Sequence, residues 1–375
     1  MVNGLSLFAN VGIAETYLHE VGVNIVVANE LLEERAKFYK HLYPACNMIS
    51  GDIRDSDVFQ QVYQASKKKD VQFIIATPPC QGMSIAGHMG ADDERNYLIK
   101  YAIDMIALIN PKFVLLENVV QQLKTPIECN GRKMLIPDYI KFRLGNDYVL
   151  NNEKIINTAD YGICQIRKRA IILLARKDLD VNWEFPPPED KKILLKDILR
   201  DVPSLWPIIR EKEYKYKLPH NTDKALSFHK WHQPPVHCWR NVECMLYTEA
   251  GNTAFDNPVH YPKRRDGKRI TGFDTTYHRM YWEKPAPTVT RYNGSIGSQN
   301  NVHPGKFWRR DENGDKMYSD PRVLSIYELM KISSLPDDWN IPEWAKDELI
   351  RHVIGEGIPP LLIKKIVNGI KEKLS

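Results

Sequence analysis

The chain has 375 residues, with 52 Lys and Arg against 47 Asp and Glu, a net charge of +5, and 43% hydrophobic residues. This composition is typical of a folded globular protein and excludes a disordered chain. No apolar stretch is long enough to span a membrane, and the N-terminus lacks the pattern of a secretory signal peptide. We therefore expect a cytoplasmic protein with one large domain and a smaller second one.

The six cysteines form no Cys-x-x-Cys pair and have no histidines at the spacing of a zinc site. Such a distribution is typical of a protein from a reducing compartment. We expect free thiols and no bound metal.

Short apolar runs alternate with helical patterns over the first half of the chain. Runs at 5–8, 25–28, 73–76 and 113–116 predict strands, and the segments leading to residue 21, 31–42 and 96–109 have helical patterns. This alternation predicts an α/β fold with a doubly wound, largely parallel, Rossmann-like sheet. Later apolar runs at 148–156 and 170–175 would complete the sheet as a hairpin at its edge.

The alternation ends at three consecutive prolines, 186–188, which predict a connection between domains. We expect a catalytic and cofactor-binding domain at 1–183, a loop-rich second domain at 184–339 and a C-terminal segment at 340–375 that returns to the first domain. The stretch 206–316 carries 19 Lys and Arg against 12 Asp and Glu, and five of the eight tryptophans. This excess fits a nucleic-acid surface, and equally a solvated basic face.

A tight turn and two acids follow the first three predicted strands. The turn runs from Phe8 to Gly12 and contains Asn10, while Glu30 and Asp52 lie where the second and third strands end. Acids at the ends of successive strands, after a glycine turn, are typical of a site for an adenosine-bearing cofactor. Taken singly, each of these features is also typical of an ordinary turn or helix cap.

A cysteine in a rigid loop follows the fourth strand, at the cleft edge of the predicted sheet. The loop reads Thr-Pro-Pro-Cys80-Gln-Gly, and Glu117 ends the next strand. An exposed thiol there is a candidate nucleophile, although a small residue packed under the loop is the alternative. Further along, Gln165, Arg167 and Arg169 alternate and would share one face, as they also would on a solvated edge strand.

The Pro-Cys80-Gln loop, the Glu117-Asn-Val strand end and the Gln165-x-Arg-x-Arg segment, in this order, resemble the DNA (cytosine-5) methyltransferase family of prokaryotic restriction-modification systems. The resemblance extends over nearly the whole chain. Weaker matches include the turn from Leu7 to Gly12 and the segments 322–328 and 354–360.

The resemblance implies transfer of a methyl group from S-adenosylmethionine to C5 of a cytosine that has swung out of duplex DNA, leaving S-adenosylhomocysteine. The Cys80 thiolate would attack C6, Glu117 would act at N3, and an arginine would hold O2. The expected catalytic residues are Cys80, Glu117, Arg167, Arg169, Pro79 and Gln81. The expected cofactor-binding residues are Phe8, Asn10, Gly12, Glu30, Leu31, Asp52, Ile53, Pro78, Leu98 and Glu356.

Double-stranded DNA is the expected partner, with the basic second domain reading it from the major groove. The candidate contacts are Gln81, Ser84, Gln165, Lys263, Arg264, Arg265, Arg269, Arg291, Arg309 and Arg310. We further expect a monomer of a prokaryote or virus, with a cognate restriction endonuclease as a possible functional companion. Alternatives are an RNA (tRNA) cytosine-5 methyltransferase, a catalytically inactive nucleic-acid-binding relative and a Rossmann dehydrogenase.

Four residues depart from the family pattern. Asn10 and Ile13 stand where the cofactor turn usually has glycines, and Met83 stands where the catalytic loop commonly has Phe. Glu356 places a carboxylate where a neutral amide is usual. The first two put the contact with the methionine end of the cofactor in question.

Overall fold

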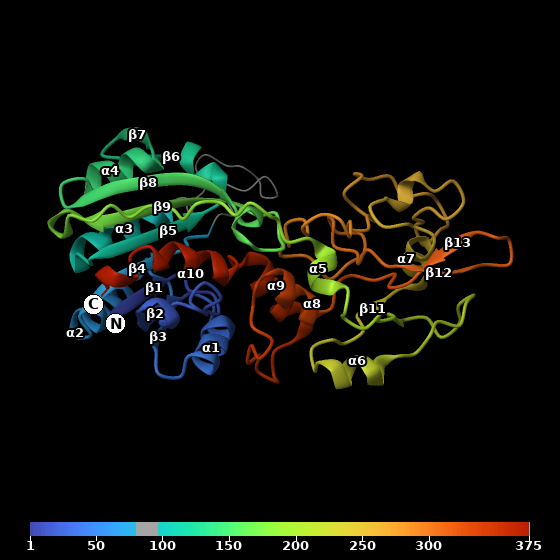
Figure 1. Ribbon diagram of the computed structural model, residues 1–375. Helices are drawn as coiled ribbons and strands as arrows, with labels where there is room; N and C mark the ends of the chain where they lie inside the picture. The colour runs from blue at the N-terminus through green and yellow to red at the C-terminus, as the bar shows by residue number, and fades with distance from the viewer. Residues whose placement is uncertain (80–96, 375) are drawn as a thin grey trace.

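The computed structural model describes residues 1–79 and 97–374, which form two parts lying side by side (Figure 1). The first part contains a seven-stranded sheet, and the second consists largely of loops. Both chain termini lie on the first part, on the side away from the second. The predicted fold class, a doubly wound sheet joined to a smaller loop-rich part, is confirmed.

The sheet has the order β3-β2-β1-β4-β5-β9-β8. Its first five strands are parallel, and β9 and β8 are antiparallel additions, as the predicted edge hairpin requires. The strand bounds are β1 (Val2–Leu7), β2 (Val23–Glu30), β3 (Asn47–Ser50), β4 (Val71–Ala76), β5 (Phe113–Asn118), β8 (Tyr148–Asn157) and β9 (Lys168–Arg176). Because β1 lies between β2 and β4, the chain reverses its direction of travel there, and ligands of such sheets bind at this point.

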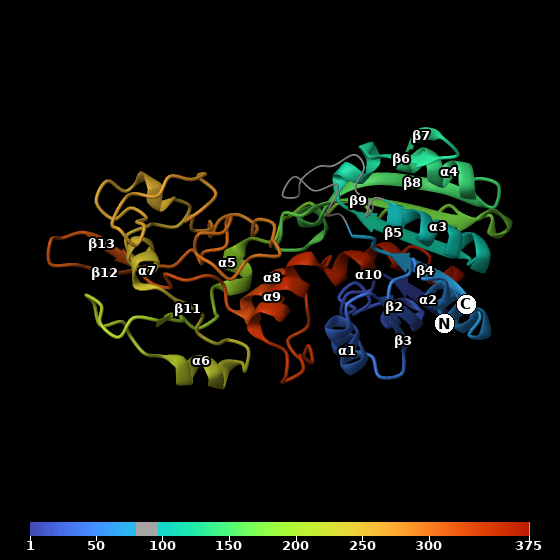
Figure 2. The same cartoon turned by 180° about the vertical axis from the view of Figure 1, so that it is seen from behind.

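Helices cover both faces of the sheet, as Figures 1 and 2 show from opposite sides. One face is covered by α2 (Ser56–Lys68), α3 (Leu98–Ile109) and α4 (Ile136–Leu144), and the other by α1 (Glu33–Leu42) and α10 (Pro360–Asn368). A small hairpin, β6 (Pro126–Cys129) and β7 (Arg132–Leu135), lies beside α4. Apolar side chains of each strand alternate between the two layers, which explains the apolar runs in the sequence.

The predicted helix between the first two strands is absent from the structure. That segment consists of turns with a short 3-10 helix at His19–Val21. Three of its residues, Phe8, Asn10 and Gly12, have positive φ angles of 58°, 51° and 83°, which a right-handed helix does not accommodate. The backbone instead makes a series of turns directly after the end of β1.

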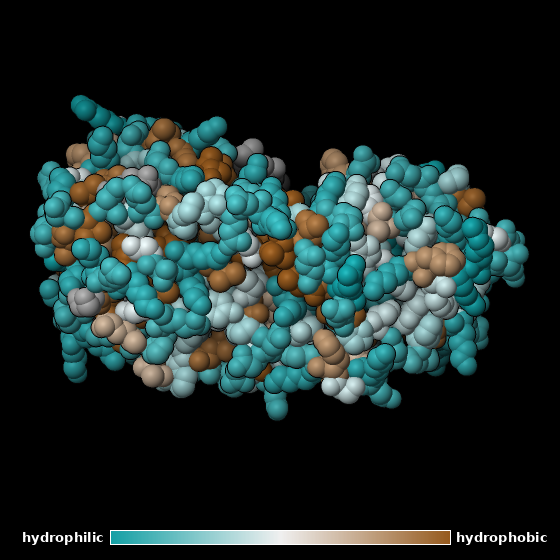
Figure 3. All heavy atoms as spheres, in the orientation of Figure 1, coloured by the Kyte–Doolittle hydropathy of each residue, from teal (hydrophilic) through white to brown (hydrophobic). Residues whose placement is uncertain are grey.

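The second part has few regular elements. They are α5 (Leu195–Leu199), β10 (Ile208–Ile209), α6 (Thr222–Phe228), β11 (Val236–His237), α7 (Trp239–Leu246), β12 (Phe307–Arg310) and β13 (Lys316–Tyr318). A hydrophobic cluster around Trp206, Met245 and Val302 forms its core. The space-filling view shows a notch in the outline between the two parts and mostly hydrophilic residues over the second (Figure 3).

Two further helices, α8 (Ile326–Ile332) and α9 (Asp347–Glu356), lie between the parts. Their apolar side chains share a cluster with Val11 and Ile13 of the N-terminal turn and Phe38 of α1. Helix α10 then packs on the sheet beside Trp183, whose Nε1 donates to the carbonyl of Ile366. No helix among the described residues is long and apolar enough to cross a membrane.

Candidate active site

Glu117 and Arg169 form a buried ion pair where β5 ends. The Nε atom of Arg169 lies 3.0 Å from Oε1 of Glu117, and their side chains are 14% and 10% exposed. The pair forms because Glu117 lies opposite Ile171 in the antiparallel β5-β9 ladder, so Arg169, two residues away, is on the same face. Burial raises the pKa of Glu117 above its ordinary value, and the charges of Arg169 and then Arg167 offset part of that rise.

Arg167 has a different environment, although the sequence pattern placed it with Arg169. Its guanidinium donates to the carbonyl oxygens of Val289, Gly355 and Glu356 at 3.0, 3.0 and 2.9 Å. The residue is 2% exposed. Arg167, which directly precedes β9, therefore connects that strand's start to the loop at Val289 and to the end of α9.

Gln165 is also buried, at 2% exposure, and its amide nitrogen donates to Ser333 Oγ at 3.2 Å. Its neighbours are the residues around Ala286, with which it forms a parallel bridge. A contact between Gln165 and DNA, expected from the sequence, therefore has no support in this arrangement, because the side chain is enclosed by protein.

The chain that leads into the cysteine loop is attached to the end of β5. The side-chain amide of Asn118 donates to the carbonyl of Pro78 at 3.0 Å, and Asn118 itself is 2% exposed. Thr77 donates through its hydroxyl to the carbonyl of Phe8 and through its N–H to that of Leu7. These bonds bring the start of the loop beside both Glu117 and the N-terminal turn. The predicted residues Cys80, Gln81 and Ser84, with Met83, lie outside the described residues.

The expected cofactor residues gather at the carboxyl ends of the parallel strands. Glu30 accepts hydrogen bonds from the backbone N–H of Asn10 at 2.8 Å and of Leu32 at 3.0 Å, which orients its carboxylate. Leu31 beside it is 57% exposed. Of the other expected residues, Phe8 and Gly12 follow β1, Asp52 and Ile53 follow β3, Pro78 follows β4, and Leu98 is the first residue of α3.

Asp52 and Ile53 differ in accessibility. The carboxylate of Asp52 is paired with Arg54 at 2.7 Å, and hydrogen bonding to that arginine lowers the pKa of Asp52. Ile53 is 3% exposed and belongs to the core under α2 and α3. Asp52 is thus a partly exposed carboxylate that Arg54 holds just after β3, whereas Ile53 is part of the core.

The departures in the N-terminal turn have local explanations. Asn10 has a φ of 51°, in the left-handed region that Asn enters more readily than other non-glycine residues. Ile13 is 3% exposed, and a Cβ on Gly357 would lie 2.9 Å from its Cδ1. The methyl groups of Ile13 therefore fill space against a glycine of the C-terminal segment.

Glu356 also departs from the family pattern, and the structure gives it two cationic partners. Its carboxylate lies 2.7 Å from Arg35 and 3.3 Å from Arg291. Arg35 and Asn118 were not among the predicted site residues. A carboxylate at position 356 predicts a cationic partner nearby, but the sequence alone does not identify that partner as Arg35.

The basic residues of the second part are mainly on its surface. Lys263 and Arg269 form an antiparallel bridge at the base of a short turn, with Arg264 and Arg265 exposed at its tip. Two further exposed arginines, Arg309 and Arg310, end β12. Several of these cations lie over aromatic rings, for example Arg309 over Trp308 at 4.2 Å. Arg291 is different, because it pairs with Glu356.

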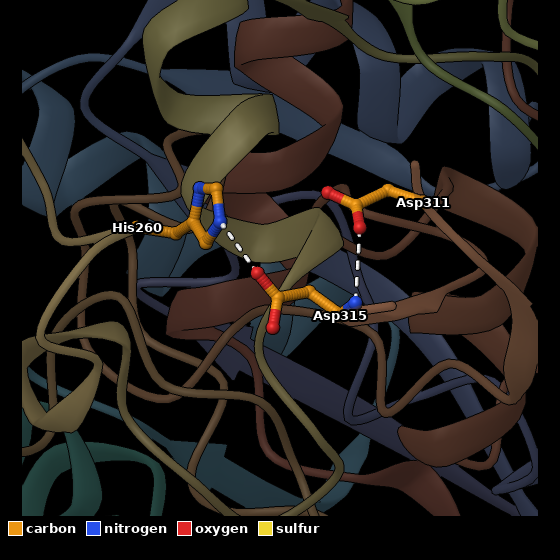
Figure 4. Close-up of side chains that lie close together, drawn as sticks. All are labelled: His260, Asp311 and Asp315. Atoms are coloured by element: carbon orange, nitrogen blue, oxygen red, sulfur yellow. Dashed lines mark hydrogen bonds and ion pairs between the residues drawn. The ribbon is translucent and has the colours of Figure 1, made fainter. Parts of the chain in front are cut away.

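One group in the described part of the chain has the residue types of a metal site: His260, Asp311 and Asp315 (Figure 4). The carboxylate of Asp311 accepts hydrogen bonds from the backbone N–H of Asn313 and Asp315 and from the hydroxyl of Tyr247. These bonds close the turn between β12 and β13, so Asp311 has a structural role there.

Comparison with known proteins identifies relatives along the entire chain. The family model described as C-5 cytosine-specific DNA methylase matches residues 2–372. The chain is 40% identical over 374 residues to the Type II methyltransferase M1.HgaI of Avibacterium volantium, covering 98% of each. It is 31% identical over 376 residues to the Type II methyltransferase M.MthTI of Methanothermobacter thermautotrophicus, covering 98% and 97%.

Two solved structures share the fold at low sequence identity. One, from E. coli, is assigned as a DNA modification methyltransferase encoded within a prophage; its TM-score is 0.67 at 17% identity, with 99% of both chains covered. The other, the methyltransferase EhMeth of Entamoeba histolytica, has a TM-score of 0.61 at 15% identity, covering 100% and 99%.

Proposed function

The chain belongs to the C-5 cytosine-specific DNA methylase family, and from this membership we propose that Cys80, Glu117 and Arg169 carry out methyl transfer to a cytosine in duplex DNA. The enzyme class itself, a DNA cytosine-5 methyltransferase, follows from the family and from the Type II methyltransferases that match it across their lengths. The observation that supports the residue roles best is the buried Glu117-Arg169 pair beside the start of the cysteine loop.

Cytosine C5 is a weak nucleophile until the aromatic ring is interrupted. The Cys80 thiolate would form a bond to C6, and the displaced electron pair would make C5 an enamine-like carbon that takes the methyl group. Loss of the C5 proton to a base and elimination of the Cys80 sulfur from C6 then restore the ring. Since C6 is hidden in stacked DNA, the cytosine must leave the helix first.

Glu117 is suited to contact the edge of the cytosine ring that carries N3. Burial raises its pKa, which favours the protonated carboxyl group that can donate to N3 as charge develops there. Arg169 would hold both the Glu117 carboxyl group and O2 of the base, because its guanidinium has more than one donor edge. Arg167, with three backbone carbonyls as partners, is better suited to support the site than to bind the base.

The family implies S-adenosylmethionine as the methyl donor, and the residues at the strand ends fit an adenosine-bearing molecule. Glu30 offers an oriented carboxylate for ribose hydroxyls, and exposed Leu31 offers an apolar surface for a ring. Asn10 Oδ1 is buried and lacks a hydrogen-bond partner in the described residues, as a ligand-contacting atom would. When bound, this cofactor supplies an electrophilic methyl group.

We assign recognition of DNA to the second part, with Lys263, Arg264, Arg265 and Arg269 as one group of contacts and Arg309 with Arg310 as another. Their exposure and the positive charge of this stretch favour phosphate binding. The relatives are named Type II methyltransferases, and we further propose a monomeric cytoplasmic enzyme that protects the sites of a companion endonuclease.

Expression in a bacterial host that lacks cytosine-5 methylation, followed by bisulfite sequencing, tests the activity at every cytosine of the host DNA. We expect methylation at one short sequence, and none with a Cys80→Ser variant of equal abundance. A methyl mark in tRNA alone would overturn the DNA assignment in favour of an RNA methyltransferase. Absence of any mark would favour an inactive nucleic-acid-binding protein.

A further inference from the structure

Glu356 joins three segments that are distant in the sequence. It is the last residue of α9, and its Oε2 lies 2.7 Å from a terminal guanidinium nitrogen of Arg35, in the first turn of α1. Its Oε1 lies 3.3 Å from Nε of Arg291, in the second part of the molecule. The side chains of Glu356 and Arg35 are only 24% and 14% exposed, so solvent screens their attraction less than at an open surface.

The backbone beside Glu356 is closely packed. A Cβ on Gly355 would lie 2.2 Å from the carbonyl oxygen of Thr290, and Arg167 binds the carbonyls of both Gly355 and Glu356. This end of α9 is therefore a rigid support, on which the Glu356 side chain is held in place.

Arg35 connects that support to the cofactor residues. Its backbone N–H donates to the carbonyl of Leu32 at the start of α1, and the N–H of Leu32 in turn donates to the Glu30 carboxylate. That carboxylate also accepts from the N–H of Asn10 in the N-terminal turn. A shift of the first turn of α1 would therefore move Glu30. On the opposite side, Ile13 of the same N-terminal turn rests on Gly357.

We propose that Glu356 is a positioning residue for the cofactor, acting through Arg35 to hold the start of α1 and thereby the Glu30 carboxylate in the orientation that binds ribose. This inference rests on the proposed cofactor site. The carboxylate at position 356 and the cation at position 35 work as a unit, so removal of either charge has the same consequence as removal of both.

The test measures the affinity for S-adenosylhomocysteine by isothermal titration calorimetry in the intact protein. We expect Arg35→Gln and Glu356→Gln each to raise the dissociation constant by roughly three- to tenfold, the range for a partly buried ion pair. The double variant should show no more than the larger single effect. Arg35→Lys, which keeps the charge, should stay within about twofold of the wild type.

Glu348→Gln is the matched control, because Glu348 is a carboxylate on α9 that is 81% exposed and contacts only His352 among the ion pairs of the described residues. It should bind like the wild type. Single variants that bind like the wild type, or a double variant whose effect equals the product of the singles, would overturn the proposal. If Glu356→Gln does not fold, judged by its thermal melt, Glu356→Asn takes its place in the cycle.

Failure of the wild-type protein to bind S-adenosylhomocysteine would instead contradict the proposed cofactor site. The two failures are thus distinguishable.

Discussion

Nε of Arg169 lies 3.0 Å from Oε1 of Glu117, and the two residues come from neighbouring antiparallel strands at the edge where the parallel strands end. A carboxyl group that is buried yet paired with one cation has two competing influences on its pKa. Burial is the larger, and it raises the pKa of Glu117.

Arg169 and Arg167 should respond differently to the same substitution. Arg169→Gln removes the partner of Glu117 and the proposed contact with O2, so we expect the methyl-transfer kcat to fall by about 100-fold, or ~3 kcal/mol. Its loss of stability should be smaller than that of Arg167→Gln, because Glu117, whose pKa is already raised, can take up a proton. Arg167→Gln leaves three buried carbonyls without their donor and should destabilise the fold by about 3 kcal/mol. Radiolabelled methyl transfer and thermal melts measure the two effects. Equal losses of activity and stability in both variants would contradict the distinction.

Glu15, in the turn-rich segment between β1 and β2, should make stability depend on pH. Burial raises the pKa of Glu15 to about 7 from 4.5, and the Ser6 hydroxyl offsets only part of this rise. The folded protein therefore holds a proton that the unfolded chain releases, so stability falls between pH 4.5 and 7, by about 3 kcal/mol in total.

A Glu15→Gln variant should lose that dependence. Relative to the wild type, it should gain free energy of unfolding as the pH rises from 5 to 8, measured by urea denaturation. Glu33→Gln, at an exposed position at the start of α1, is the control. Its free energy of unfolding should stay close to that of the wild type at every pH. If the difference in unfolding free energy between Glu15→Gln and the wild type does not change with pH, Glu15 does not titrate in this range.

Asn10 should tolerate glycine but not alanine. Its φ of 51° lies in the left-handed region, which glycine adopts without strain and which alanine adopts only at a cost in free energy. We expect Asn10→Ala to cost about 1 kcal/mol of unfolding free energy and Asn10→Gly to remain within about 0.5 kcal/mol of the wild type. The backbone N–H that binds Glu30 is present in both variants. The reverse order of stabilities would mean that the side chain of Asn10 matters more than its backbone.

The exposed turn at 264–265 should contribute to DNA affinity through charge. Replacing Arg264 and Arg265 by Ala should weaken binding to a mixed-sequence duplex and reduce the slope of log K against log salt by about 0.9 for each DNA phosphate that the protein no longer neutralises. Fluorescence anisotropy over a series of salt concentrations measures this slope. A paired Ala replacement of Lys67 and Lys68, which are exposed on α2 of the first part, should leave the slope unchanged. Equal slopes for both pairs would remove the 264–265 turn from the proposed DNA surface.

Much of the first part of the molecule could be predicted, because neighbouring residues in the sequence decide where its strands lie. Apolar runs at 25–28, 73–76 and 113–116 lie in β2, β4 and β5 as expected, since a strand buried on both faces needs a continuous apolar stretch. Glu30 and Glu117 follow from their places at strand ends, because parallel strands bring those ends to one edge. The helix expected before Val21 was wrong, since backbone angles imposed by the turn at Phe8, Asn10 and Gly12 override a weak periodic pattern.

The sequence by itself determined the α/β class, the order of the strand-end acids and the motif around Cys80, since each is written in neighbouring residues. Only the tertiary structure separated Arg169, which reaches Glu117, from Arg167, which binds the loop at 289 and the end of α9. Likewise, only the tertiary structure identifies Arg35 as the partner of Glu356. Long charged side chains can reach many partners, and the segments that meet here are hundreds of residues apart, so their pairing depends on how the helices and loops pack rather than on any local pattern.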